Sequence, residues 1–140
     1  MSALVTLLNE IRSCRICEKH LPHGVRPVLH VSETARLFIV GQAPGLRVHE
    51  SGMSFNDRSG DRLREWMGID RETFYDESKI GIAGMAFCFP GYDTHGHDRP
   101  PRPECAKTWR TRLFAALPEM PLTLLVGRHA PSLGPERAVG

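Results

Sequence analysis

Four cysteines are the residues of this chain whose type and spacing most directly suggest chemistry. Cys14 and Cys17 form a Cys-x2-Cys pair, and sixteen residues of a Pro-rich stretch separate Cys88 from Cys105. Four thiolates are the usual ligand set of an iron–sulfur cluster or a structural zinc ion. Cys14 and Cys17 can also be two free thiols, and Cys88 can simply be buried at the end of a strand. We expect a metal centre held by all four.

The second candidate site is the stretch GQAPG at residues 41–45, which follows the apolar run RLFIV. Pro44 fixes one backbone φ angle, and the glycines on either side permit conformations that other residues avoid. Backbone N–H groups presented by such a loop can bind an anion or polarise a carbonyl group. The spacing differs from those of the dinucleotide and phosphate-loop glycine motifs. Taken alone, the stretch can also be an ordinary turn after a strand.

Alternating strands and helices are expected to position these residues. Ser59 is the predicted N-cap of a helix that stops at Gly68, and Pro103 leads into a later helix. Strands that alternate with helices predict an α/β fold, a three-layer α/β/α sandwich with a central parallel sheet. The periodicity predicts helices at 2–12, 59–68 and 104–117, a helical turn at 71–76, buried strands at 36–40, 80–87 and 121–127, and irregular segments at 13–34 and 88–103.

Length and composition indicate one soluble globular domain. The chain has 140 residues, of which 41% are hydrophobic and 24% charged, and its net charge is +2. Only Lys19, Lys79 and Lys107 are lysines among 18 basic residues. Arginine suits bidentate phosphate contacts, although an arginine-rich genome gives the same bias. Neither a signal peptide nor an apolar run of membrane length is apparent, so we expect a cytoplasmic monomer without a membrane partner.

The segment that starts at Gly41 resembles a known motif. Aligned without gaps, it resembles the sequence GE-A/G-PG-x-x-E-D-x-x-G-x-P-F-V-G-x-A-G of the uracil-DNA glycosylase superfamily, and of family 4 in particular. The matching positions are Gly41, Ala43, Pro44, Gly45, Gly52, Phe55 and Gly60. The cysteines also resemble the layout of family 4, in which a loop similar to CFPGYDTHGHDRPPRPEC separates the second pair. The resemblance extends from about residue 10 to 127.

This resemblance implies an enzyme of base-excision repair that acts on DNA. Such an enzyme flips a uracil or related deaminated base out of the DNA stack and hydrolyses its N-glycosidic bond. Phe55 matches the aromatic residue that stacks on the base, and Asn56 and Asp57 are the nearest polar substitutes for reading its edge. The implied substrate-binding residues are Gly41, Ala43, Pro44, Gly45, Phe55 and Asn56. The implied cofactor is a [4Fe–4S] cluster on Cys14, Cys17, Cys88 and Cys105, with structural zinc as the alternative.

Three positions depart from the family pattern. Gln42 stands where family 4 has Glu, and an amide can orient a water molecule but cannot take its proton. His49 occupies part of the acidic pair and is a candidate base or phosphate contact. Gly84 aligns with the Asn that reads the uracil edge. We therefore take Gln42 and His49 as the catalytic candidates and also expect that activity can be weak or absent.

The last residues do not follow the expected pattern. We expect a glycosylase-like domain at residues 1–127 and an irregular tail at 128–140, which can be aberrant. The family has a His in an HPS motif after a further helix and strand, and we expect this chain to lack both elements. The alternative function is a non-catalytic, metal-bearing nucleic-acid-binding module. Its phosphate contacts would come from Arg58, Arg62, Arg99 and Arg102.

Overall fold

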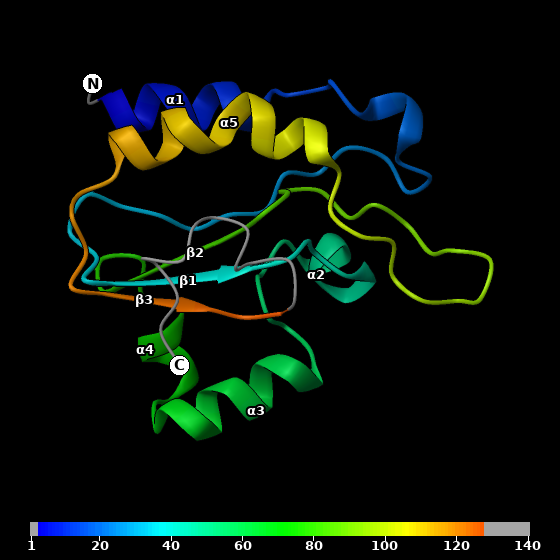
Figure 1. Cartoon of the computed structure of the whole chain (residues 1–140). Coiled ribbons are helices and arrows are strands. Elements are labelled where there is room, and N and C mark those ends of the chain that lie inside the picture. Colours follow the sequence, from blue (N-terminus) through cyan, green and yellow to red (C-terminus); the bar gives the residue numbers. More distant parts are fainter. Residues whose placement is uncertain (1–2, 128–140) are drawn as a thin grey trace.

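Three parallel strands form the centre of the computed structural model, which describes residues 3–127 (Figure 1). The strands are β1 (Leu37–Gly41), β2 (Ile80–Gly84) and β3 (Leu122–Leu125), and their order in the sheet is β2-β1-β3. Each connection between them contains at least one helix, as parallel strands require. The expected α/β class with a parallel sheet is therefore confirmed.

Helices cover both faces of the sheet and give the molecule three layers (Figure 1). The helices α1 (Ala3–Arg12) and α5 (Pro103–Ala116) pack against each other on one face. The opposite face carries α3 (Arg58–Met67) and α4 (Arg71–Phe74). The short helix α2 (Leu46–Ser51) lies beyond the carboxyl ends of the strands. This is the predicted three-layer arrangement, and it leaves one end of the sheet free for a site.

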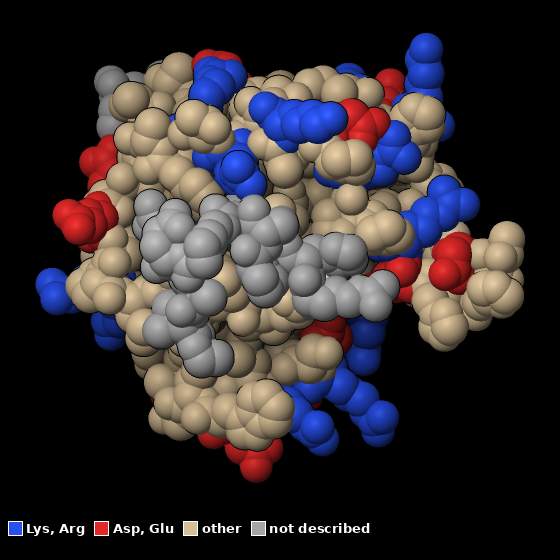
Figure 2. All heavy atoms as spheres, in the orientation of Figure 1, with Lys and Arg blue, Asp and Glu red and all other residues tan. Residues whose placement is uncertain are grey.

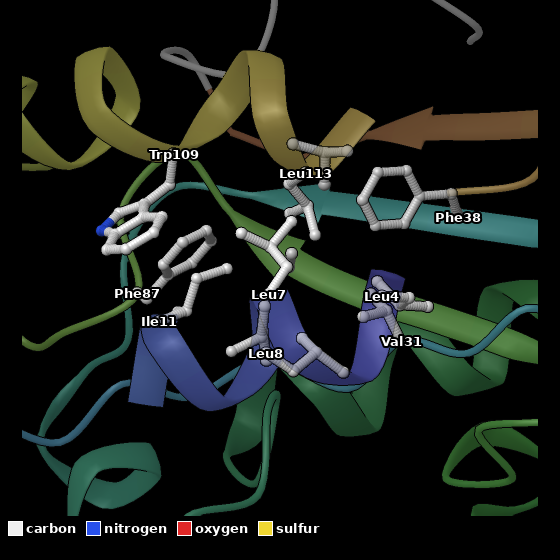
Figure 3. Close-up of a cluster of buried hydrophobic side chains, with 12 residues drawn as sticks. Leu4, Leu7, Leu8, Ile11, Val31, Phe38, Phe87, Trp109 and Leu113 are labelled. Carbon is white, nitrogen blue, oxygen red and sulfur yellow. The ribbon is translucent and has the colours of Figure 1, made fainter. Parts of the chain in front are cut away.

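The alternation of side chains along β1 divides the core into two parts. Phe38 and Val40 belong to the part beneath α1 and α5, whereas Ile39 packs with Phe74 in the part beneath α3 and α4. Figure 3 shows the first part, in which the apolar stripe of α1 meets Trp109 and other side chains of the sheet and α5. That stripe consists of Leu4, Leu7, Leu8 and Ile11. Burial of each such side chain contributes about 1.5–3 kcal/mol.

The start of α3 corrects one prediction. Asp57, not Ser59, is the N-cap: its backbone is extended, and its Oδ1 accepts a hydrogen bond from the N–H of Gly60 at 2.9 Å. The predicted Ser59 cap was wrong because Ser59 already lies inside the helix, where its own backbone is helical. Gly68 ends the helix with a φ of 70°, as predicted.

The remaining elements follow the expected pattern with two differences. The strand expected at 80–87 ends at Gly84, because the next two N–H groups, of Met85 and Ala86, donate to the carbonyls of Gly41 and Gln42. The helix α2 was not expected. The other predicted helices and strands are present within a residue or two of their expected bounds.

The segments between these elements are also close to expectation. The arm (residues 13–34) is irregular apart from one short 3-10 helix at Glu18–His20. A long loop (residues 85–102) connects β2 to α5. No helix among residues 3–127 is long and apolar enough to cross a membrane. The tail at 128–140, for which an irregular structure was predicted, lies outside the described residues.

Candidate active site and cysteine cluster

A cleft of about 230 Å³ opens at the carboxyl ends of the three strands. In open parallel sheets this is the end at which ligands bind. Its walls come from the loop at 41–45, from the segment 54–59 before and within the first turn of α3, and from the ends of β2 and β3. Val28 of the arm, Val48 of α2 and Asp98 of the long loop complete the lining. The cleft therefore combines backbone from the strand ends with side chains from distant parts of the chain.

Most residues predicted for the substrate site line this cleft. They are Gly41, Gln42, Ala43, Pro44, Gly45 and Phe55. Asn56 does not belong to the lining, and its Oδ1 accepts a long hydrogen bond from Arg71 at 3.5 Å. His49 also lies outside the lining: its Nε2 is 3.0 Å from the carbonyl oxygen of His23 in the arm, and its Nδ1 is buried without a partner among the described residues. The roles expected for these residues stay predictions.

Phe55 forms the aromatic wall of the cleft and has an unusual backbone. Its φ is 56°, a left-handed conformation that costs a residue with a side chain about 1–2 kcal/mol. Such strain is typical of functional sites, where the surrounding structure enforces it. The ring lies across Gly41, where an added Cβ would be 3.3 Å from the Phe55 Cζ atom. The ring is therefore held directly over the first residue of the GQAPG loop.

Arg64 supports Phe55 from behind. The side chain is 5% exposed, and its Nη1 donates hydrogen bonds to the carbonyl of Phe55 and to the hydroxyl of Tyr75, both at 3.3 Å. Its Nη2 pairs with Asp61 at 2.7 Å. The Tyr75 hydroxyl in turn donates to the carbonyl of Ser54 at 2.6 Å. Charged side chains on a helix usually face solvent, but Arg64 is buried because it fixes the strained segment at the carbonyl of Phe55.

Arg64→Met is expected to lower the free energy of unfolding by about 2 kcal/mol, because two acceptors lose a charged donor in a half-buried setting. Urea denaturation measures this change. Arg62→Met is the matched control, since Arg62 is exposed and lies two residues from Arg64 on the opposite side of the same helix, and it should change stability by less than about 0.5 kcal/mol. Equal losses in the two variants would contradict the supporting role of Arg64.

The floor of the cleft has no room for a side chain at Gly84. A Cβ there would lie 2.4 Å from the carbonyl oxygen of Gln42 and 2.7 Å from that of Ala86. Glycine at this strand residue thus permits a close approach of the backbone. The position that aligns with the uracil-reading Asn therefore cannot hold an Asn with this backbone. Other groups must contact the polar edge of a bound base.

Asp98 is a cleft residue that sequence reasoning missed. It lies on the rim and remains exposed, and its Oδ2 would be 3.5 Å from a Cβ placed on Gly45. Partial burial, with a smaller contribution from the charge of Asp57, raises the pKa of the Asp98 carboxyl group. A loop without periodicity gives no signal of which side chain returns to the sheet, so the sequence offered no means of finding it.

The four cysteines gather where the end of α1, the arm and the long loop meet the start of α5. All four are free thiols and half-buried. The charge of each of Cys14, Cys17 and Cys88 acts on Cys105, which places the four thiols in one neighbourhood. Cys105 stands in the first turn of α5.

Nitrogen donors surround the sulfur atoms. The indole Nε1 of Trp109 lies 3.4 Å from the Sγ of Cys14, and the backbone N of Phe87 lies 3.4 Å from the Sγ of Cys105. Such N–H groups stabilise thiolate ligands of iron–sulfur clusters and help to set their potentials. The remaining two sulfur atoms have similar partners: the Arg102 side chain donates to Cys17 and the Arg26 backbone to Cys88.

Burial raises the pKa of three of the four thiols and so keeps these three protonated in the absence of a metal. It raises the pKa of Cys88 to about 11 and that of Cys105 to about 12, and it also raises the pKa of Cys17. A bound metal must therefore displace protons from the thiols, as is usual for cysteine sites. Within residues 3–127 no three His, Cys, Asp or Glu side chains are arranged around a single metal ion. Cys14 and Cys17 belong to the arm, Cys88 to the long loop and Cys105 to α5.

Basic side chains do not concentrate in one patch on the face seen in Figure 2, where Lys and Arg are spread over the surface. Among the arginines suggested for phosphate contact, Arg62 stacks over the exposed ring of Trp66 at 5.9 Å. Arg99 donates from Nε to the carbonyl of Tyr92 at 3.0 Å. Arg102 pairs with Glu104 beside the cysteines. The Arg102 side chain is thus already paired within the protein.

A model of the uracil DNA glycosylase superfamily matches residues 29–138, well over half of the chain. The chain belongs to this superfamily. The match contains every described lining residue of the cleft except Val28, and it contains the second cysteine pair, whereas Cys14 and Cys17 precede it. Superfamily membership indicates a DNA glycosylase-like function in DNA repair and supports DNA as the partner.

Proposed function

We propose that the chain is a family 4 uracil-DNA glycosylase, which hydrolyses the N-glycosidic bond of uracil or a related deaminated base flipped out of DNA. The observation that carries this proposal is the cleft at the strand ends, where the Phe55 ring stands over the GQAPG loop. A flat base inserted there would stack on Phe55 and place its polar edge against the backbone. The cleft volume of about 230 Å³ suits one base rather than a base pair.

The loop offers donors for the charge that develops on the departing base. The N–H groups of Ala43 and Gly45 have no backbone acceptor among residues 3–127, and both residues line the cleft. Preorganised N–H groups of this kind stabilise an oxygen that becomes negative in the transition state. The Gln42 amide can orient a water molecule or bind the base edge, and Gln42 is itself fixed because its carbonyl accepts from the N–H of Ala86 at 3.1 Å.

We also propose a [4Fe–4S] cluster on Cys14, Cys17, Cys88 and Cys105, with structural zinc as the alternative. The half-buried thiols and their N–H donors support this assignment. The cluster would cross-link the arm, the long loop and α5. The cysteines would thereby fix the loop that brings Asp98 to the cleft. The proposed metal centre would thus hold the wall of the cleft in place.

Phe55→Ala tests whether the cleft holds the base. It is expected to lower kcat/KM for release of uracil from a single-stranded oligonucleotide by roughly 10- to 100-fold, because base–aromatic stacking is worth about 1–3 kcal/mol. Phe55→Tyr keeps the ring and is the matched control, with activity within about threefold of wild type. Thermal melting of each variant separates loss of stacking from loss of fold.

Two outcomes would count against the proposal. Release at the wild-type rate by Phe55→Ala would exclude Phe55 from base binding. A wild-type chain that binds uracil-containing DNA and releases no base would favour the non-catalytic nucleic-acid-binding module, for which the absence of a carboxylate at Gln42 is the supporting observation.

A further inference from the structure

Hydrolysis at the sugar needs a group that can take a proton from water, and Gln42 cannot supply it. The carboxyl groups that line the cleft, within the described part of the chain, belong to Asp57 and Asp98. Asp57 is committed to the helix α3, since its Oδ1 accepts from the N–H of Gly60 at 2.9 Å. This leaves Asp98 as the carboxylate to consider.

The carboxyl group of Asp98 has no hydrogen bond or ion pair among residues 3–127. It faces both the main cleft and a neighbouring groove of about 360 Å³ that shares Gln42 and Pro44 with it. Its Oδ2 would lie 3.5 Å from a Cβ placed on Gly45, so the carboxyl group lies beside the GQAPG loop. A carboxylate in this position is available to a water molecule on the side of the GQAPG loop.

The long loop holds Asp98 in place through its backbone. Tyr92 and Asp98 form an antiparallel bridge, and the N–H of Arg99 donates to the carbonyl of Gly91 at 2.9 Å. The Arg99 side chain does not neutralise Asp98, because its Nε donates to the carbonyl of Tyr92 at 3.0 Å. The loop thus presents an unpaired carboxylate on a hydrogen-bonded turn.

We propose that Asp98 is the general base of the glycosylase reaction, in place of the carboxylate that is absent at residue 42. This inference rests on the proposed function. The Asp98 carboxylate takes a proton from the water molecule as the water oxygen bonds to C1′ of the sugar. The bond from C1′ to the base nitrogen breaks, and its electron pair leaves with the base. The base anion then takes a proton from Asp98 or from solvent, which yields an abasic sugar and the free base.

The electrostatics of the cleft suit this role. Partial burial and the charge of Asp57 both raise the pKa of Asp98, and a carboxylate with a raised pKa is a stronger base. In enzymes the pKa of a carboxylate that acts as a general base is commonly raised in this way. Because the carboxylate has no stabilising partner in the fold, its removal should leave stability unchanged.

The test compares Asp98→Asn with the full wild-type chain in a uracil-release assay on a single-stranded oligonucleotide. Asp98→Asn is expected to lower kcat by about 10²- to 10⁴-fold, the usual contribution of a general base. Asp98→Glu should recover part of that loss. Glu50→Gln is the matched control, because Glu50 is an exposed carboxylate of α2 that does not line the cleft, and it should have wild-type activity.

A binding measurement separates this role from a structural one. The probe is an oligonucleotide with 2′-fluoro-2′-deoxyuridine, which resists hydrolysis, and Asp98→Asn should bind it within about threefold of wild type. An active wild type with an equally active Asp98→Asn variant would overturn the assignment of Asp98 alone, and so would a variant that loses binding together with turnover. A wild type that releases no base would overturn the proposed function and this assignment with it.

Discussion

Cys105→Ser is expected to yield protein without stoichiometric iron, without visible absorbance, and with a melting temperature lower by roughly 10 °C or more. Serine is a poor ligand for iron, and the free energy of metal binding contributes to folding when the site forms only in the folded chain. A loss of about 3 kcal/mol corresponds to a shift of this size for a domain of 140 residues. Metal analysis, absorbance and thermal melting measure the three effects.

Trp109→Phe is the matched control for this substitution. It removes the 3.4 Å hydrogen bond to the Sγ of Cys14 and leaves all four thiols in place, so iron should be retained. Stoichiometric zinc in a colourless wild-type protein would contradict the iron–sulfur proposal and support the zinc alternative. Full retention of iron in Cys105→Ser would contradict the four-cysteine centre itself.

Gly60→Ala is expected to lower the free energy of unfolding by about 2–4 kcal/mol, although helix propensity alone predicts a gain. Alanine inside a helix is more favourable than glycine by about 0.5–1 kcal/mol. Here the new Cβ would lie 1.7 Å from the carbonyl oxygen of Phe55 and 2.6 Å from its carbonyl carbon. Backbone atoms cannot rotate away, so the chain must shift, and the overlap outweighs the propensity.

This shift should also reach the cleft, since the displaced residue is the aromatic wall. Gly60→Ala is therefore expected to lower kcat/KM for uracil release together with stability. Gly68→Ala is the matched control: nothing lies within 4 Å of a Cβ there, and only its left-handed φ of 70° opposes the substitution. It should cost about 1–2 kcal/mol and leave kcat/KM unchanged. Stabilisation by Gly60→Ala, measured in urea, would contradict the close approach of residues 55 and 60.

Much of the fold could be predicted because local signals agree with it. The stripe of α1 has clear helical spacing, the strands are short apolar runs, and Gly68 marks a helix end. The GQAPG loop could be placed at the sheet edge because parallel strands expose their carboxyl ends together. These features depend on neighbouring residues, which a sequence displays directly.

Features that depend on distant parts of the chain could not be predicted. The spacing of Arg64 is that of a surface residue. Its side chain is buried because it donates to the carbonyl of Phe55, nine residues earlier, which only the tertiary fold brings close to it. Asp98 reaches the cleft through the closure of an irregular loop onto Tyr92. The helix α2 has only six residues, and the glycines at its two ends, Gly45 and Gly52, were interpreted as motif positions instead of caps. In each case the deciding contact joins parts of the chain that are distant in sequence, and the periodicity of the local sequence does not reveal it.

We expect the cleft over the GQAPG loop to catalyse hydrolysis of the N-glycosidic bond of a deaminated nucleotide in DNA. The most direct measurement is chromatographic quantification of free uracil after incubation of the full 140-residue chain with single-stranded DNA that carries one deoxyuridine. We predict release of uracil in amounts that exceed the enzyme concentration, with an abasic site left in the strand. An absence of free uracil with the metal-loaded protein, under conditions where it binds the same DNA, would contradict the claim.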